Sequence, residues 1–189
     1  NESAILAITK HANDGLKSTY LAKLISGEWA GTMCLTEPHA GTDLSLLSTK
    51  AIPNEDGSFN ITGSKIFISS GDHDWTDNIL HLVLARLPDA PAGVKGISLF
   101  LAPKFLPLDD GGIGQRNAVT VGSIEKKMGL KASPTCVMNF DAAQGFLVGE
   151  ANDGLACMFT MMNDARFQVG LQGLGIAEAS YQGALTYAR

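Results

Sequence analysis

The sequence carries its most informative stretch at residues 34–43, which read Cys-Leu-Thr-Glu-Pro-His-Ala-Gly-Thr-Asp. These residue types predict a strand that ends at Thr-Glu-Pro, followed by a tight turn. Pro38 ends strand pairing because it has no N–H, and Gly41 permits a positive φ or the close approach of a ligand. Thr42 and Asp43 can hydrogen-bond to turn amides. From spacing alone, a plain β-turn is the simplest interpretation of this stretch.

Around this stretch, residues 29–152 alternate short runs rich in Ile, Val, Phe and Thr with frequent turn signals. Asn54-Glu55-Asp56-Gly57 predicts a hairpin with Asp-Gly at its tip. Several short strands at regular spacing favour a mainly β fold, either an antiparallel β-barrel or an orthogonal sandwich. The expected strands are Ser48–Ile52, Ser58–Ser69, Asn78–Arg86, Gly96–Ala102, Ala118–Ile124, Thr135–Phe140 and Phe146–Val148.

The two ends of the chain, residues 1–28 and 153–189, are expected to be α-helical segments that flank the β block. In the first, apolar residues recur at three- and four-residue steps. A break is expected at Asn13-Asp14-Gly15 and a stop at Ser26-Gly27. The second is apolar on most sides and contains four glycines, which predicts that it packs closely within a larger protein or oligomer.

The composition excludes several classes of protein. The chain has 189 residues, 45% of them hydrophobic and 17% charged, and a net charge of −5, which argues against disorder and against a nucleic-acid partner. No apolar run is long enough for a membrane span, and the first residues do not resemble a secretory signal. Three widely spaced cysteines predict buried free thiols in a reducing compartment. A cytoplasmic location is therefore expected.

Residues 34–43 resemble the signature of the acyl-CoA dehydrogenases. Ile61–Gly71 is similar to the second flavin-contacting strand of that family. Met161–Arg166, followed by Val169–Gly175, is similar to the first helix of its C-terminal domain. One departure is Leu46, where the family signature has a small residue. The resemblance to a bacterial branch that includes 3-methylmercaptopropionyl-CoA dehydrogenase rests on Gly71–Asp74, Asn78–Pro91, Lys95–Leu101 and Ile124–Gly129.

This resemblance implies a domain division and two binding sites. Residues 1–28 would end an N-terminal helical domain, 29–152 would form the middle β domain, and 153–189 would be the truncated first helix of a C-terminal helical domain. The residues implied to bind FAD are Met33, Leu35, Thr36, Gly41, Thr42, Phe67, Ile68 and Ser69. The residues implied to contact the acyl-CoA are Thr42, Asn163 and Arg166.

The reaction implied by the resemblance is α,β-dehydrogenation of an acyl-CoA thioester. A glutamate removes the α proton while hydride leaves the β carbon for flavin N5. Some members of the family place that glutamate immediately before the arginine of the C-terminal helix, where this chain has Ala165. Glu37 is read as structural, and Glu125 and Glu178 as surface or packing residues. The catalytic base is therefore expected outside this chain, and the chain alone is expected to be inactive and to bind FAD weakly.

The resemblance also implies an acyl-CoA substrate, an unidentified flavoprotein-type electron acceptor, and a dimer or tetramer of the full-length protein. An acyl-CoA oxidase or flavin monooxygenase of the same fold, or a non-catalytic β-barrel binding module, remains an alternative. Read as plain strand residues, Phe67 and Ile68 would be core. Arg166 is expected to have a partner, with an ion pair as the structural alternative. Asp72-His73-Asp74 is read as a solvated loop, so no metal is expected.

Overall fold

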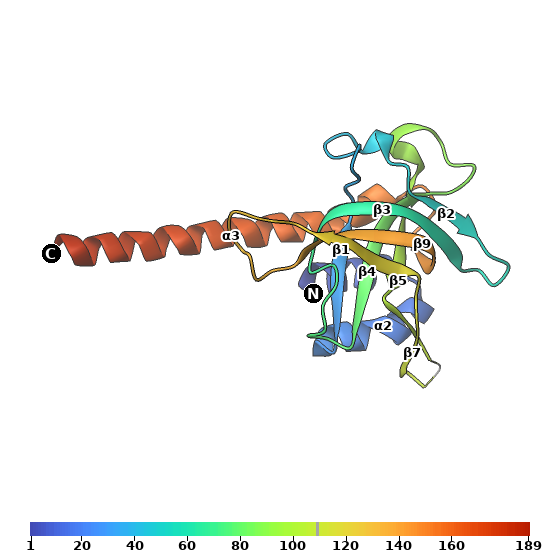
Figure 1. Cartoon of the computed structure of the whole chain (residues 1–189), viewed down its shortest axis with the longest axis horizontal. Helices are drawn as coiled ribbons and strands as arrows, with labels where there is room; N and C mark the ends of the chain where they lie inside the picture. Colours follow the sequence, from blue (N-terminus) through green and yellow to red (C-terminus); the bar gives the residue numbers. More distant parts are fainter. Residues whose placement is uncertain (109) are drawn as a thin grey trace.

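The computed structural model describes residues 1–108 and 110–189, and its elements run helix, β block, helix (Figure 1). Two helices, α1 (Glu2–His11) and α2 (Asp14–Ser26), come first, and the long helix α3 (Gly154–Ala188) comes last. In the described residues between them lie short 3₁₀ turns η1 (Leu44–Leu46) and η2 (Gly93–Gly96) and the strands β1 (Trp29–Cys34), β2 (Lys50–Pro53), β3 (Phe59–Ser69), β4 (Asn78–Arg86), β5 (Ile97–Pro103), β6 (Phe105–Pro107), β7 (Ile113–Arg116), β8 (Val119–Ile124) and β9 (Thr135–Val148).

The main sheet curls back on itself. Its strand order is β1-β4-β2-β3-β9-β5, and β8 pairs with β9. A further β4–β5 pairing closes the ring from β4 to β5, and β1 lies outside that ring, paired with β4. The seam between β2 and β4 is one residue pair, Lys50 with Arg86. The mainly β prediction is confirmed, but the sheet is mixed because β1 and β4 are parallel. Residues 35–77 form a connection long enough to return the chain to the same end of the sheet, which parallel pairing requires.

Strand β9 differs from the expected pair of short strands. Thr135–Val148 is one 14-residue strand. Residues 141–145, which lie between the two expected strands and include the turn-forming types Asp and Gly, continue its pairing with β3. Ala142 bulges out of this ladder at φ 54°, and its N–H donates to the Thr62 hydroxyl at 3.2 Å. A bulge absorbs an extra residue while the strand continues, so turn-like residue types did not end β9.

Strands β4 and β5 separate two hydrophobic cores. Because successive side chains point to opposite faces, Leu80, Leu82 and Leu84 of β4 enter a core shared with the helices. Val83 and Ala85 enter a second core, closed by β3, β8 and β9. This two-sided burial explains why β4 and β5 read as nearly continuous apolar runs. All three cysteines are free and buried in these cores, as expected.

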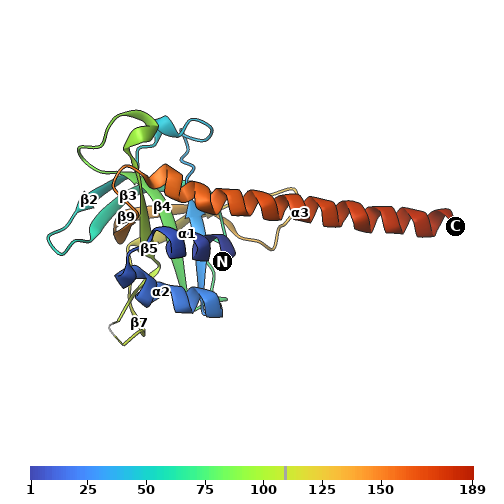
Figure 2. The ribbon, with the colours of Figure 1, turned by 180° about the vertical axis from the view of Figure 1, so that it is seen from behind.

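The helices α1 and α2 cover the first core (Figure 2). The expected break between them lies at Asn13, whose side chain caps α2 by accepting a hydrogen bond from the Leu16 N–H at 2.9 Å. Gly27 ends α2 at φ 81°, a conformation that glycine adopts without steric penalty. Both boundaries follow from local chemistry that the sequence displays.

Helix α3 packs only at its beginning and then extends away from the sheet (Figures 1 and 2). Gly154, Cys157, Met158 and Met161 are buried, whereas most large apolar side chains from Phe167 onward are exposed. In the described residues, no helix is both long and apolar enough to cross a membrane. The second half of α3 therefore has no packing partner within the described part of this chain.

Candidate functional site

Two of the stretches that carry the family resemblance, residues 34–43 and Ile61–Gly71, meet where β1 ends beside β3. The Ile66 N–H donates to the Thr36 carbonyl at 2.8 Å. The Lys65 ammonium donates to the neighbouring Leu35 carbonyl at 3.0 Å. These two hydrogen bonds hold the backbone of Leu35–Thr36 beside Lys65–Ile66, although the two segments lie about thirty residues apart in sequence.

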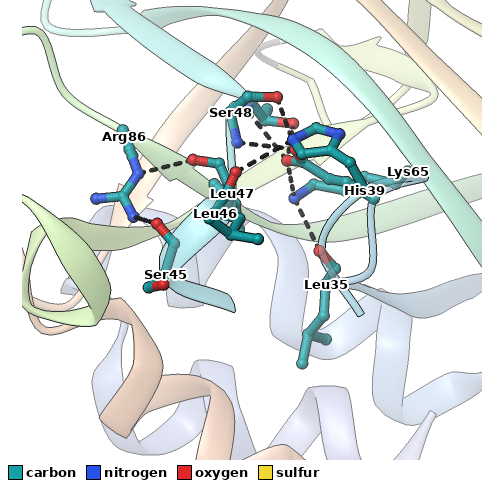
Figure 3. A network of polar contacts seen from close by, with 10 residues as sticks. Leu35, His39, Ser45, Leu46, Leu47, Ser48, Lys65 and Arg86 are labelled. Carbon is teal, nitrogen blue, oxygen red and sulfur yellow. Dashed lines mark hydrogen bonds and ion pairs between the residues drawn. The ribbon is translucent and has the colours of Figure 1, made fainter. Parts of the chain in front are cut away.

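Glu37 lies at the centre of a buried polar network, in which Figure 3 labels Ser48 and Lys65. Its carboxylate accepts hydrogen bonds from the N–H and hydroxyl of Ser48, both at 2.8 Å, and from the N–H and hydroxyl of Thr49. It also pairs with the Lys65 ammonium at 2.9 Å. Burial opposes ionisation, but Lys65 and these donors outweigh it and lower the pKa of Glu37 to about 2. The structural role expected for Glu37 is confirmed.

The loop after Glu37 is tied down through its backbone carbonyls (Figure 3). The guanidinium of Arg86 donates to the carbonyls of Leu47 at 2.7 Å and Ser45 at 2.8 Å. The His39 ring donates to the Leu46 carbonyl at 3.1 Å. Within this loop Gly41 and Thr42 are exposed, and a side chain at position 41 would meet open space. The loop thus presents both residues to solvent from a fixed support.

Phe67 is exposed and adopts an unusual backbone conformation. It lies in an irregularity of β3 between Lys65 and Ile68, at φ 61°, with 58% of its surface exposed. Positive φ is rare for a bulky residue and clusters at functional sites. The strand-core alternative for Phe67 is therefore wrong.

Ile68 and Ser69 point in opposite directions from their strand. The Ile68 side chain is 2% exposed and belongs to the second core, whereas Ser69 is exposed. Only the backbone of Ile68 remains available to a ligand on the outer face. This is a correction to the expected set as far as the Ile68 side chain is concerned, and it follows from the two-residue alternation of a strand.

A small apolar hollow lies between β1 and α3. It has a volume of about 330 Å³ and is lined by Met33, Met162, Ala165, Arg166 and Val169. No carboxylate is among these lining residues. The hollow therefore joins Met33, which directly precedes the first motif, to the part of α3 between Met162 and Val169.

Arg166 has polar and aromatic partners but is exposed. Its guanidinium donates to the Asn163 side-chain oxygen at 2.9 Å and lies 5.3 Å from the centre of the Phe159 ring. Across residues 1–108 and 110–189, no carboxylate lies within ion-pair distance of Arg166. Within the described residues Arg166 therefore forms no ion pair, and its side-chain partner Asn163 lies one helical turn away.

Two other features of the molecule fall outside this site. Asp72 pairs with Lys104 and Arg116, and the described part of the chain holds no group of three side chains suited to a metal. A larger hollow, about 660 Å³, lies between α2 and the β6–β7 hairpin and contains none of the motif residues. Size alone therefore does not identify the candidate site.

The outer face formed by the two motifs suits a flat, partly apolar ring with a polar edge. Phe67 offers an aromatic surface, and Met33 and Leu35 are partly buried apolar side chains of the β1 segment that also pack against the first core. Thr36 and Ser69 carry hydroxyls that can donate or accept. A flavin has this chemistry, with a fused ring and polar atoms along its pyrimidine edge, so the residues present fit that group.

Sequence reasoning missed two supporting residues, Lys65 and Arg86. Lys65 is fully buried. It lies four residues after the buried Ile61 on β3, and because side chains alternate along a strand, this spacing could have predicted that Lys65 points inward. A lysine on an inward-facing position needs an acceptor or a carboxylate partner, and Glu37 of the other motif supplies one. Arg86 ends a buried strand and gave no comparable signal, because its acceptors are all backbone carbonyls.

Comparison with known proteins agrees with this fold and site. Residues 32–143 match the family model described as acyl-CoA dehydrogenase, middle domain. The chain therefore belongs to the acyl-CoA dehydrogenase family and contains its middle domain. Members of this family are FAD-dependent oxidoreductases.

Individual relatives match nearly the whole chain. It is 55% identical over 186 residues to 3-methylmercaptopropionyl-CoA dehydrogenase of Ruegeria pomeroyi, covering 98% of this chain and 32% of that protein. It is 41% identical over 197 residues to butyryl-CoA dehydrogenase of Syntrophomonas wolfei, covering 100% of this chain and 32% of that protein. The chain thus spans about a third of the length of the curated relatives it matches.

A solved structure supports the same assignment. Butyryl-CoA dehydrogenase from Megasphaera elsdenii superposes with a TM-score of 0.74 at 32% identity, over 93% of this chain and 43% of that chain. The mixed sheet with its terminal helices is therefore the fold of an acyl-CoA dehydrogenase.

Proposed function

We propose that this chain supplies the FAD-facing surface of an enzyme that desaturates acyl-CoA thioesters between the α and β carbons. The observation that carries this proposal is the meeting of Thr36 and Ile66, which brings Thr36 beside the exposed Phe67. The relatives named as acyl-CoA dehydrogenases support the substrate class.

The cofactor-binding role belongs to residues on this outer face. When bound, FAD would accept the hydride that leaves the β carbon. Phe67 would cover part of the ring and exclude water, and the Thr36 and Ser69 hydroxyls would hydrogen-bond to its polar atoms. The full proposed set is Met33, Leu35, Thr36, Gly41, Thr42, Phe67, the backbone of Ile68, and Ser69.

The acyl-CoA would contact Thr42, Asn163 and Arg166. Arg166 lines the apolar hollow with Met33, and Asn163 holds the guanidinium through its side-chain oxygen. Ala165 also lines this hollow and cannot remove a proton. We therefore expect a glutamate from outside these 189 residues to act as the base.

The broader organisation of the protein follows as part of the same proposal. Residues 1–28 would belong to an N-terminal helical domain, 29–152 to the middle domain, and 153–189 to the C-terminal helical domain. The exposed apolar side chains of α3 agree with packing against further helices. A homo-oligomeric full-length protein, a flavoprotein-type electron acceptor and a cytoplasmic location remain predictions.

Titrating the purified chain with FAD tests the proposed cofactor. We expect saturable binding, and Phe67→Ala should weaken it by about tenfold, because stacking on one aromatic ring contributes roughly 1–3 kcal/mol. Phe167→Ala is the matched control, since this exposed phenylalanine lies on the projecting part of α3. Equal loss of binding in both variants, or no binding by the parent chain, would contradict the proposal.

A turnover assay tests the absence of a base from the hollow. We expect the 189-residue chain, loaded with FAD and given butyryl-CoA and an artificial electron acceptor, to show no reduction of the acceptor. Robust turnover would mean that a carboxylate of this chain reaches the substrate, and the assignment of Ala165 to the base position would be wrong.

A further inference from the structure

We propose that the buried Glu37–Lys65 pair is a positioning device that fixes the spacing between the two FAD-facing segments, Leu35–Thr36 and Phe67–Ser69. The inference rests on the proposed function, because it assigns these segments to the same bound ring. Neither residue reaches the outer face: Lys65 is 0% exposed and Glu37 is 2% exposed. They would therefore act through the backbone rather than by touching the cofactor.

The Lys65 ammonium links both segments directly. It donates to the Leu35 carbonyl at 3.0 Å and to the Glu37 carboxylate at 2.9 Å. Lys65 itself lies two residues before Phe67, at the start of the β3 irregularity. A shift of the lysine would thus move the Leu35 carbonyl and the strained Phe67 backbone relative to one another.

The Glu37 carboxylate anchors the same lysine to a third segment. Its other hydrogen bonds come from Ser48 and Thr49, at the far end of the loop that carries Gly41 and Thr42. Thr49 also packs against Gly63 of β3, where an added Cβ would lie 2.3 Å from the Thr49 hydroxyl oxygen. The pair therefore connects the end of β1, the loop and β3 at one point.

Stability alone does not explain a buried ion pair at this place. Replacing both partners of such a pair by neutral groups is often neutral or stabilising, whereas removing one partner leaves an uncompensated charge. Burial lowers the pKa of Lys65, and Glu37 opposes that effect. A directional requirement, such as holding the Leu35 carbonyl, is a reason to keep a charged donor here.

The test compares single and double variants of the pair. Lys65→Met leaves the carboxylate unpaired, and Glu37→Gln with Lys65→Met removes both charges. Leu99→Ala is the control for general destabilisation, because Leu99 lies in the other core. Each variant is measured for thermal midpoint, for FAD affinity, and for exchange of the Ile66 amide hydrogen relative to the Leu82 amide in β4.

The expected pattern separates positioning from stability. The double variant should recover most of the thermal midpoint lost in Lys65→Met but should keep a weakened FAD affinity, by about tenfold, since the bond to the Leu35 carbonyl is still absent. Its Ile66 amide should exchange about tenfold faster than in the parent chain, relative to Leu82. Leu99→Ala should lower the thermal midpoint while leaving FAD affinity and the exchange ratio within about twofold.

Three results would overturn the inference. These are parental FAD affinity in the double variant, an unchanged Ile66 exchange ratio, or an equal loss of FAD affinity in Leu99→Ala. The exchange ratio needs no cofactor, so it tests the positioning role even if the parent chain binds no FAD. Failure of the proposed function and failure of this inference are therefore distinguishable.

Discussion

Phe67 combines exposure with a backbone conformation that favours glycine. At φ 61° an L-residue with a Cβ is penalised by about 1–2 kcal/mol. The irregularity that holds it lies between Lys65, which is bonded to Glu37 and Leu35, and Ile68, which is buried in the core. Fixed neighbours on both sides thus maintain a strained residue on the outer face.

Because of this strain, glycine should be more stabilising than alanine at position 67, the reverse of the usual order in a strand. Phe67→Gly should be more stable to denaturant than Phe67→Ala by about 1 kcal/mol, because both lack the ring and only glycine accepts this φ. At Ser69, for which the structure gives no positive φ, the order should reverse, with Ser69→Ala the more stable. Denaturant midpoints of the four variants provide the measurement. The same order at both positions would argue against strain at Phe67.

Glu37 predicts a specific dependence of stability on pH. Its pKa is about 2 in the folded chain against an ordinary 4.5, so its contribution is complete above pH 4.5 and is lost as the pH falls toward 2. The difference amounts to roughly 3 kcal/mol. As the pH falls across this window, the unfolding free energy of the parent chain should therefore drop relative to that of the Glu37→Gln, Lys65→Met double variant. If the unfolding free energies of the two chains changed in parallel with pH, the low pKa assigned to the buried Glu37 carboxylate would be contradicted.

Individual residues show where sequence reasoning was sufficient and where it was not. Glu37 was read as structural because it matches no position of a catalytic base in the family, and its buried contacts with Lys65, Ser48 and Thr49 agree with that reading. The outward direction of Phe67 was not, because an irregularity in β3 breaks the simple alternation of the strand. The buried place of Lys65 could have been inferred from its phase with Ile61, but its partners come from another segment of the chain.

Secondary structure elements were predicted best where the local chemistry decides them. The end of α2 at Gly27 and the β2–β3 hairpin follow from glycine and Asp-Gly signals. The parallel pairing of β1 with β4 and the unbroken course of β9 depend on contacts distant in sequence. No local pattern encodes them.

Two glycines of helix α3 should respond in opposite ways to substitution by alanine. An added Cβ at Gly154 would lie 2.2 Å from the Ser98 carbonyl carbon, whereas at Gly173 it would meet nothing within 4 Å. Gly154→Ala should therefore destabilise the chain by about 1–3 kcal/mol. Gly173→Ala should instead raise helix content, since alanine is favoured over glycine by about 1 kcal/mol in a helix.

Thermal unfolding followed by far-UV circular dichroism measures both variants. Equal stability of Gly154→Ala and the parent chain would mean that α3 does not begin against β5. A loss of helix content in Gly173→Ala would mean that a close neighbour, absent from the described contacts, packs on that face.

On the scale of the whole molecule, one β block carries helices at both ends, and the proposed FAD-facing surface lies where the end of β1 meets β3. The family resemblance rested on three short motifs in order, and the mainly β architecture on short strands at regular spacing. The face itself depends on long-range contacts, such as that between Thr36 and Ile66, which spacing along the chain does not reveal. The projecting half of α3, with its exposed apolar side chains, fits a chain that spans about a third of its relatives' length.

The most direct test of this account is to map FAD onto the chain by the amide chemical shifts that it perturbs in an NMR titration. The account predicts that the shifts concentrate at Thr36, Thr42, Phe67 and Ser69. Shifts that cluster instead around Leu16 and the larger hollow beside α2, or no saturable shifts at all, would contradict it.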